Sequence, residues 1–136
     1  MNERLARNER FARLGLRLAL GTAFLSAVAS RFGLWGARSG HWSGFLKYAA
    51  EVNWYLPANL IPAVAVASTV CELVFGLALV AGWRVRWAAH GSAALLMMFA
   101  LAMASGDPKS PFDYSVFTAS MGALLLGCTV RKEETR

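Results

Sequence analysis

The chain has 136 residues, of which 57% are hydrophobic and only 16% charged, and its formal net charge is +6. This length suits one domain, and the charged fraction is well below the quarter that is usual in soluble proteins. Because the charges gather at the two ends and in short stretches between apolar runs, the composition indicates an integral membrane protein and argues against a nucleic-acid-binding one.

Four apolar segments are the predicted elements, and each approaches the roughly 20 residues that a helix needs to cross a bilayer. They occupy residues 14–30, 60–82, 87–104 and 114–130. The sequence therefore predicts an all-α fold, an up-down bundle of four membrane helices over residues 14–130. Residues 1–13 are expected to form a basic tail, and residues 131–136 a charged one.

The first segment also resembles a secretory signal. Arg13, the apolar run after it and the small residues Ala27-Val28-Ala29 match the order of a signal peptide and its cleavage site. Arg17 lies inside the run, and cleavage would leave three helices with one face unpaired. We therefore expect the segment to remain as the first membrane helix.

The connections alternate between long and short. About 29 residues join the first two segments, and their stretch 41–56, HWSGFLKYAAEVNWYL, predicts a short amphipathic helix lying in the interface. An irregular loop anchored by tryptophans is the alternative. Residues 83–86 predict a tight helical hairpin, and the Gly- and Pro-containing residues 105–113 end the third helix. Asp113 is expected to cap the N-terminus of the fourth helix.

The orientation follows from the lysine and arginine counts on the two sides of the membrane. Nine lie on the side of the termini: Arg4, Arg7, Arg10, Arg13, Arg84, Arg86, Arg131, Lys132 and Arg136. Four lie on the other side: Arg31, Arg38, Lys47 and Lys109. The prediction is a multi-pass protein of the cell (inner) membrane with both termini in the cytoplasm.

Small residues recur every fourth position on three segments and predict close helix packing. The sets are Gly15, Ala19, Ala23 and Ala27; Ala63, Ala67 and Cys71; and Ala119, Ala123 and Gly127. These seams could join the helices of one bundle, or one of them could face a second copy of the chain. A homo-oligomer therefore stays open.

Glu72 is the least expected residue of the second segment. It lies about 20 Å along the helix from Asn59, and Arg17 lies about 21 Å from Arg31, at 1.5 Å per residue. The two charges therefore match in depth when measured from the outer boundary. Because a charge inside the membrane costs at least ~2.5–3.5 kcal/mol, we expect Arg17 and Glu72 to relieve each other.

Three interpretations of Glu72 remain open: a structural ion pair, a ligand or proton site, and a protonated carboxyl bonded to a hydroxyl group. Small or hydroxylated residues on the same helix face would leave room beside the carboxylate, and His90 could approach the region or lie at the headgroups. The candidate ligand or proton site comprises Arg17, Glu72, Ser68, Thr69, Gly76 and His90. Cys71 and Cys128 show no metal-ligand or CxxC spacing, so no metal is predicted.

Several motifs resemble the DoxX family. They are Arg17-Leu-Ala-Leu-Gly21, Arg31-Phe32-Gly33, ELVFGLALVAGWRVRWAA (72–89) and Pro-Phe-Asp-Tyr-Ser-Val-Phe (111–117). The resemblance covers roughly residues 14–127. It implies a four-helix membrane protein associated with redox systems, such as a thiosulfate:quinone oxidoreductase, and it assigns Arg17 and Glu72 to a recurring charged pair. The chain has Arg31 where many members have lysine, and it lacks a cysteine pair.

The first functional hypothesis is therefore a membrane subunit of a redox assembly, at most part of an oxidoreductase. A quinone would enter between helices, its carbonyl would meet Arg17, and Glu72 would exchange the proton. A partner protein must supply the electrons, because the sequence has no flavin, haem or metal motif. The alternatives are a non-enzymatic membrane scaffold, whose Arg17–Glu72 pair is structural and whose aromatic outer loop docks a partner, and a small proton-linked carrier.

Overall fold

The computed structural model describes residues 1–130, and these contain helices and no strand. The α-helices are α1 (Asn2–Arg31), α2 (His41–Val52), α3 (Ile61–Ala81), α4 (Val85–Gly106), α5 (Ser110–Asp113) and α6 (Val116–Thr129). Two 3-10 turns, Gly36–Arg38 and Ala58–Leu60, precede α2 and α3. The all-α prediction is confirmed.

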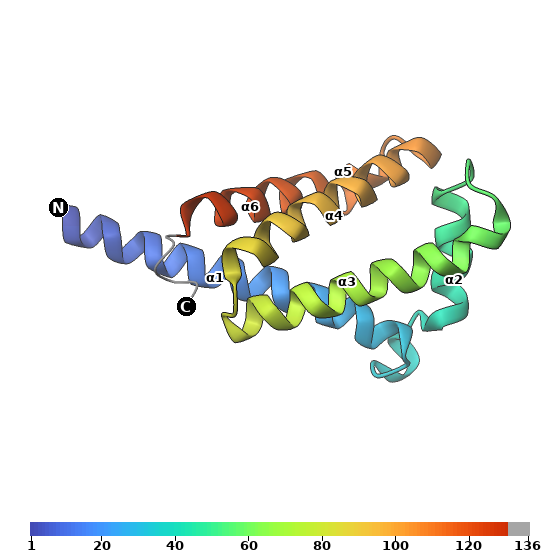
Figure 1. Ribbon diagram of the computed structural model, residues 1–136, viewed down its shortest axis with the longest axis horizontal. Helices are drawn as coiled ribbons and strands as arrows, with labels where there is room; N and C mark the ends of the chain where they lie inside the picture. Colours follow the sequence, from blue (N-terminus) through green and yellow to red (C-terminus); the bar gives the residue numbers. More distant parts are fainter. Residues whose placement is uncertain (131–136) are drawn as a thin grey trace.

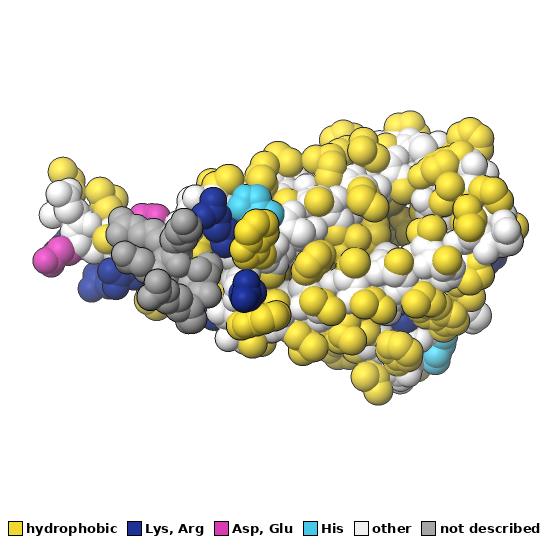
Figure 2. Space-filling model, viewed as in Figure 1, with side chains coloured by type: hydrophobic (Ala, Val, Ile, Leu, Met, Phe, Trp, Pro, Cys, Tyr) yellow, Lys and Arg dark blue, Asp and Glu magenta, His cyan; other side chains and the backbone are white. Residues whose placement is uncertain are grey.

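The helices differ in their ability to cross a membrane. Within residues 1–130, three are long and apolar enough, namely Asn2–Arg31, Ala58–Ala81 and Val85–Gly106. By contrast α6 has 14 residues, which rise about 21 Å against a hydrocarbon core of roughly 30 Å. Apolar side chains cover the outer face of the bundle, where a soluble protein would be polar (Figure 2). The protein is thus a helical membrane protein, but a bundle of four full spans is not confirmed.

Two antiparallel helix pairs form the body of the molecule. α1 packs along α3 and α4 packs along α6, and contacts between α3 and α4 and between α1 and α6 join the pairs (Figure 1). The main cluster of buried side chains lies in the half of the bundle nearer the termini and includes Leu79, Ala89 and Leu126. At the opposite end α2 lies across the bundle and contacts both α3 and α4.

The predicted hairpin between the second and third segments is confirmed. α3 ends at Gly82, whose φ of 75° is the left-handed conformation that glycine adopts at helix ends. Arg84, with φ of 44°, is the N-cap residue that directly precedes α4. The turn is short enough that α3 and α4 must lie antiparallel and adjacent.

The helix predicted in the long connection is also confirmed as α2, so the irregular-loop alternative is wrong. Ala49 is buried, while the aromatic rings of Trp42 and Phe45 lie 5.7 Å apart. Just beyond the helix, Trp54 donates a hydrogen bond from Nε1 to the carbonyl oxygen of Ser105 at 3.3 Å. The hydrogen bond from Trp54 holds the connection against the end of α4.

Within the described residues, the helices differ from the predicted segments in two places. Residues 2–13, predicted as a basic tail, continue α1 without a break and extend beyond the other helices (Figure 1). The fourth segment is interrupted at Ser115, whose φ of 54° separates α5 from α6. Asp113 therefore lies in α5 and pairs with Lys109 at 3.2 Å instead of capping the fourth helix. The charged tail predicted at 131–136 lies outside the described residues.

Only one of the three small-residue seams faces the bundle. On α6, Ala123 and Gly127 are buried as predicted. On α1 the buried face is instead Leu20, Gly21, Phe24 and Val28, while Gly15, Ala19 and Ala23 are exposed. On α3 the buried positions include Ala65, Thr69, Glu72 and Gly76, while Ala63 and Ala67 are exposed. The spacing of four was right for helix packing, but it did not identify the register.

Candidate functional site

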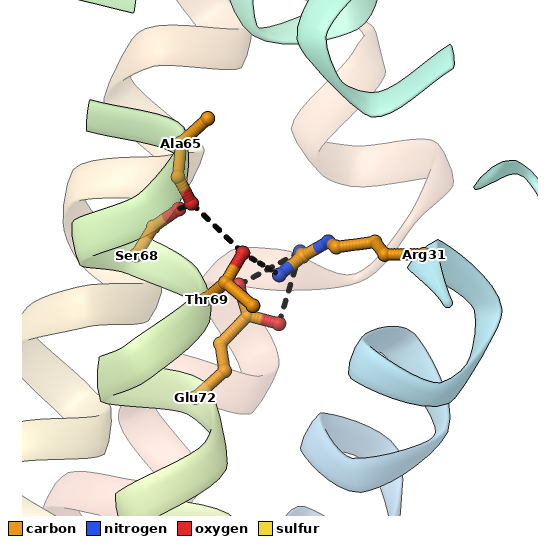
Figure 3. A network of polar contacts seen from close by, with 5 residues as sticks. All are labelled: Arg31, Ala65, Ser68, Thr69 and Glu72. Atoms are coloured by element: carbon orange, nitrogen blue, oxygen red, sulfur yellow. Dashed lines mark hydrogen bonds and ion pairs between the residues drawn. The ribbon is translucent and has the colours of Figure 1, made fainter. Parts of the chain in front are cut away.

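An ion pair joins the end of α1 to the middle of α3. Arg31, the last residue of α1, donates from Nη2 to both carboxylate oxygens of Glu72, at 2.8 and 3.0 Å. Its Nη1 donates to the hydroxyl oxygen of Thr69 at 2.8 Å. Figure 3 shows the arginine reaching across from α1 to these two residues of α3. Glu72 is only 2% exposed, so the pair is removed from solvent.

The surroundings of the pair complete its contacts. The Thr69 hydroxyl donates to the carbonyl oxygen of Ala65 at 2.8 Å, so it both accepts from Arg31 and donates along α3. The ring of Phe45, on α2, lies 3.6 Å from the guanidinium carbon of Arg31. A cation over an aromatic face is attracted by the ring quadrupole, more so when water is excluded. The site therefore ties together α1, α2 and α3.

The relative lengths of the helices explain why Arg31 meets Glu72. α1 ends level with the Thr69 turn of α3, since Arg31 reaches both Thr69 and Glu72. α3 begins at Ile61, eight residues earlier, and so extends about 12 Å past the end of α1. α2 lies in the space that this offset leaves and places Phe45 over the arginine.

The predicted pairing of Arg17 with Glu72 is wrong. Arg17 lies beside Gly82 at the other end of α3, where its Nη1 would be 3.1 Å from a β-carbon at that glycine. Gly82 is ten residues beyond Glu72, or about 15 Å along the helix. The error came from assuming that the end of α1, at Arg31, and the start of α3, after Asn59, lie at the same outer plane.

The other predicted site residues are dispersed. Ser68 donates to the Ala65 carbonyl oxygen at 3.1 Å and not to the ion pair. His90 donates a hydrogen bond from Nδ1 to the carbonyl oxygen of Arg86 at 2.7 Å and packs against Gly127 of α6. Of the six candidates, the structure brings together Thr69 and Glu72. Ser68 lies one helical turn before Glu72 on α3 but does not contact the ion pair.

Gly76 lies at a close helix crossing. A β-carbon there would be 3.0 Å from the side chain of Leu25 and 3.2 Å from the carbonyl oxygen of Gly21. The predicted free space next to this glycine is therefore occupied by α1. Close approach of two backbones through small residues is a common way to associate helices in membranes.

Sequence analysis missed Arg31 and Phe45 as site residues. Arg31 was assigned to the external loop because it follows the first apolar segment. The Arg31-Phe32-Gly33 step carried the usable signal, since Gly33 adopts a φ of 78° and ends the helix just after the arginine. Nothing in the sequence spacing indicated that Phe45 would lie over it.

The cysteines take no part in this site. Cys71 is partly buried, Cys128 is exposed, and both are free thiols. Within residues 1–130, no three histidine, cysteine, aspartate or glutamate side chains lie close enough to hold a metal ion.

Comparison with known families now adds to this geometry. A family model described as methylamine utilisation protein MauE matches residues 9–106. The chain belongs to the MauE family. The match runs from α1 to the end of α4 and includes both Arg31 and Glu72. No curated protein and no solved structure matches the chain.

Membership of the MauE family corrects the family assignment made from the sequence motifs. The resemblance to the DoxX family is wrong, because the matching family is a different one. Short apolar stretches with an arginine and a glutamate recur in many small membrane proteins, so those motifs had little discriminating power. The expectation of a membrane protein, which rested on hydropathy, is unaffected.

Proposed function

We propose that the chain is a membrane component of a redox-associated system of the methylamine utilisation type, and that it acts together with partner proteins. The observation that carries this proposal is the MauE match over residues 9–106. It agrees in its broad class with the redox-associated membrane subunit expected from the sequence. The protein is not proposed to be an enzyme by itself.

In this role the Arg31–Glu72 pair is a structural lock. This role is supported by the contacts that groups of the protein itself make with the pair. Arg31 bonds both carboxylate oxygens of Glu72 and the hydroxyl of Thr69, and Phe45 lies over its guanidinium group. A lock at this point holds α2 against α1 and α3. It would fix the end of the bundle that carries α2 and α5 as a rigid surface on which a partner can dock.

Deletion of the gene in its native host tests the proposed system. We expect loss of growth when methylamine is the only nitrogen source and normal growth on ammonium. Restoration by the wild-type gene is the control. Undiminished growth on methylamine would contradict the methylamine assignment, whereas co-purification of a redox protein from the native membrane would still support the broader class.

A quinone ligand at the Glu72 site is the second hypothesis. Titration of the purified protein with a short-tail quinone, followed by tryptophan fluorescence quenching, distinguishes it from the structural lock. The structural role predicts that any quenching is the same in the wild type and in the paired variant Arg31→Gln, Glu72→Gln. Saturable quenching that this variant loses would instead favour the quinone site.

The proposed orientation places both termini in the cytoplasm. It is supported by the count of basic residues on each side of the membrane within residues 1–130. Six lie on the side of the N-terminus, at positions 4, 7, 10, 13, 84 and 86, and four lie on the other side. In a chain with both native cysteines changed to serine, Ser39→Cys and Ser110→Cys should react with an impermeant thiol reagent from outside, and Arg86→Cys should not. The reverse pattern would invert the orientation.

A further inference from the structure

A second polar region lies at the opposite end of the bundle from Glu72. A cavity of about 280 Å³ opens there between α1, α4 and α6. It is lined by Arg10, Arg13, Leu14, Arg17, Val85, Leu126 and Val130. Its floor is therefore apolar and its charged side is made of three arginines on one stretch of α1.

Arg17 is the central residue of this cavity. Its Nε atom is buried and has no hydrogen-bond partner among the described residues. A buried polar group without a partner is costly, and a charged one more so. The position beside Gly82 brings the guanidinium to the C-terminal end of α3, where the helix dipole favours a cation. That dipole offsets part of the cost but does not provide a partner for Nε.

The two neighbouring arginines, Arg13 and Arg10, differ in their contacts and in their exposure to solvent. Arg13 donates from Nη1 to the carbonyl oxygen of Thr129 at 2.8 Å, and its Nε lies 3.9 Å from the carboxylate of Glu9. Arg10 is exposed. The positions 10, 13 and 17 fall within one face of a helix, because residues three and four apart are neighbours. An incoming group would therefore meet several guanidinium groups from one side.

The geometry points to a binding site for a phosphate group, and specifically for the headgroup phosphate of an anionic lipid in the leaflet next to the chain termini. Guanidinium groups match phosphate oxygens in pairs of parallel hydrogen bonds. Basic pockets between membrane helices are suited to anionic headgroups. A phosphate in this cavity would satisfy Arg17 from outside the protein, as Glu72 satisfies Arg31 from inside.

The position and size of the cavity favour a lipid over a free ion. Trp83 and Trp87, at the same end of the bundle, are 62% and 72% exposed, as expected for anchors at a membrane interface. The apolar floor of Val85, Leu126 and Val130 suits the glycerol carbons next to the phosphate, with the acyl chains outside the cavity. A volume of 280 Å³ lies near the lower end of the ~300–1,000 Å³ typical of small-molecule pockets, so the cavity has room for a headgroup.

The test measures thermal unfolding of the full chain in a neutral detergent, followed by tryptophan fluorescence, with three probes. These are dihexanoyl phosphatidylglycerol, dihexanoyl phosphatidylcholine and inorganic phosphate. A ligand that binds only the folded state raises Tm as its concentration passes Kd. We expect saturable stabilisation by the anionic lipid and a weaker effect of the zwitterionic one. Saturable stabilisation by inorganic phosphate, with none by the anionic lipid, would support a phosphate site but assign it to a soluble phosphate compound.

Variants identify the site. Arg17→Gln should weaken the apparent affinity for phosphatidylglycerol by about fivefold or more, the effect of about one basic contact. Arg86→Gln is the matched control: it removes one positive charge at the same end but does not line the cavity, so its titration should equal that of the wild type. Arg10→Gln is the second variant, because an exposed side chain is dispensable for folding, and it should also weaken binding.

Three results would overturn the inference. One is an unchanged titration in both Arg17→Gln and Arg10→Gln. Another is an equal loss in Arg86→Gln, which would reduce the effect to unspecific charge. The third concerns Glu133 and Glu134, which follow the lining residue Val130 in the sequence. If stabilisation appears only in the variant Glu133→Gln, Glu134→Gln, carboxylates of the chain itself are the ordinary occupants of the cavity.

Discussion

Two arginines of the same helix, Arg31 and Arg17, show two ways of placing a cation inside a membrane protein. Arg31 has a carboxylate, a hydroxyl and an aromatic ring around it, all from the protein. Arg17, about 21 Å away along α1, has a buried Nε with no such partner among the described residues and borders a cavity. The contacts of Arg31 join α1, α2 and α3 in a closed junction. Arg17 instead presents a positive charge to a cavity, where a ligand could pair with it.

The largest effect is expected from breaking the closed junction. Glu72→Gln or Arg31→Gln leaves the other charge buried and unpaired, which costs roughly 3–5 kcal/mol in soluble proteins. Water and side-chain reorientation near the membrane surface reduce this penalty, so we expect a loss of roughly 2–4 kcal/mol. Unfolding in mixed micelles with rising denaturing detergent, followed by tryptophan fluorescence, measures it.

Arg17→Gln is the comparison for that measurement. It removes the same type of side chain from the same helix but breaks no ion pair, so the free energy of unfolding should change by less than about 1 kcal/mol in lipid-free detergent. If Arg17→Gln were as destabilising as Arg31→Gln, the contrast between the two arginines would be wrong.

The helix crossing next to the junction should respond almost as strongly. At Gly76 a leucine would overlap Leu25 and the backbone of Gly21, and overpacking of this kind typically costs about 1–3 kcal/mol. At Gly15, also on a helix, a β-carbon meets nothing within 4 Å. Gly15→Leu should therefore be neutral or slightly stabilising in the same assay, because glycine lowers helix stability. Equal destabilisation by both would mean that α1 and α3 do not cross at Gly76.

Coupling energies sharpen the comparison further. Residues in direct contact show interaction energies of about 0.5–3 kcal/mol in double-mutant cycles, whereas residues more than about 7–10 Å apart are additive within about 0.5 kcal/mol. The cycle of Arg31→Gln with Glu72→Gln should fall in the first class and the cycle of Arg17→Gln with Glu72→Gln in the second. A coupled Arg17 cycle would restore the pairing inferred from depth alone.

These two arginines also show how far the sequence could be followed. Hydropathy and helix-ending residues predicted the helices, the hairpin at 83–86 and the presence of α2, because those features depend on local composition. They could not predict the axial offset of α1 against α3, because the offset involves contacts between segments that are far apart in the sequence. The offset decides which arginine meets Glu72, so the residue types of the site were predicted and the partner was not.

The register of the helix faces shows the same limit. Small residues every four positions predict a seam, but on α1 and α3 more than one face has them. The face that packs is the one where Gly21 meets Gly76, and Gly21 lies outside the predicted set. The choice between faces is made by the partner helix, through contacts far apart in sequence. Local spacing therefore limits the candidates without selecting one.

The smallest effect concerns one hydrogen bond of the closed junction. Thr69→Val keeps the side-chain shape but removes the oxygen that accepts from Nη1 of Arg31. Hydrogen bonds inside membrane proteins contribute about 0.6 kcal/mol on average and up to about 1.7 kcal/mol. Because the donor here is charged, this bond belongs in the upper part of that range, and we expect a loss of about 1 kcal/mol.

Ser68→Ala is the matched control, since the Ser68 hydroxyl also donates to the Ala65 carbonyl oxygen but does not contact the arginine. It should cost less than about 0.5 kcal/mol. Because Thr69→Ser preserves the acceptor, it should recover most of the loss. Equal effects of Thr69→Val and Ser68→Ala would show that Arg31 depends on Glu72 alone.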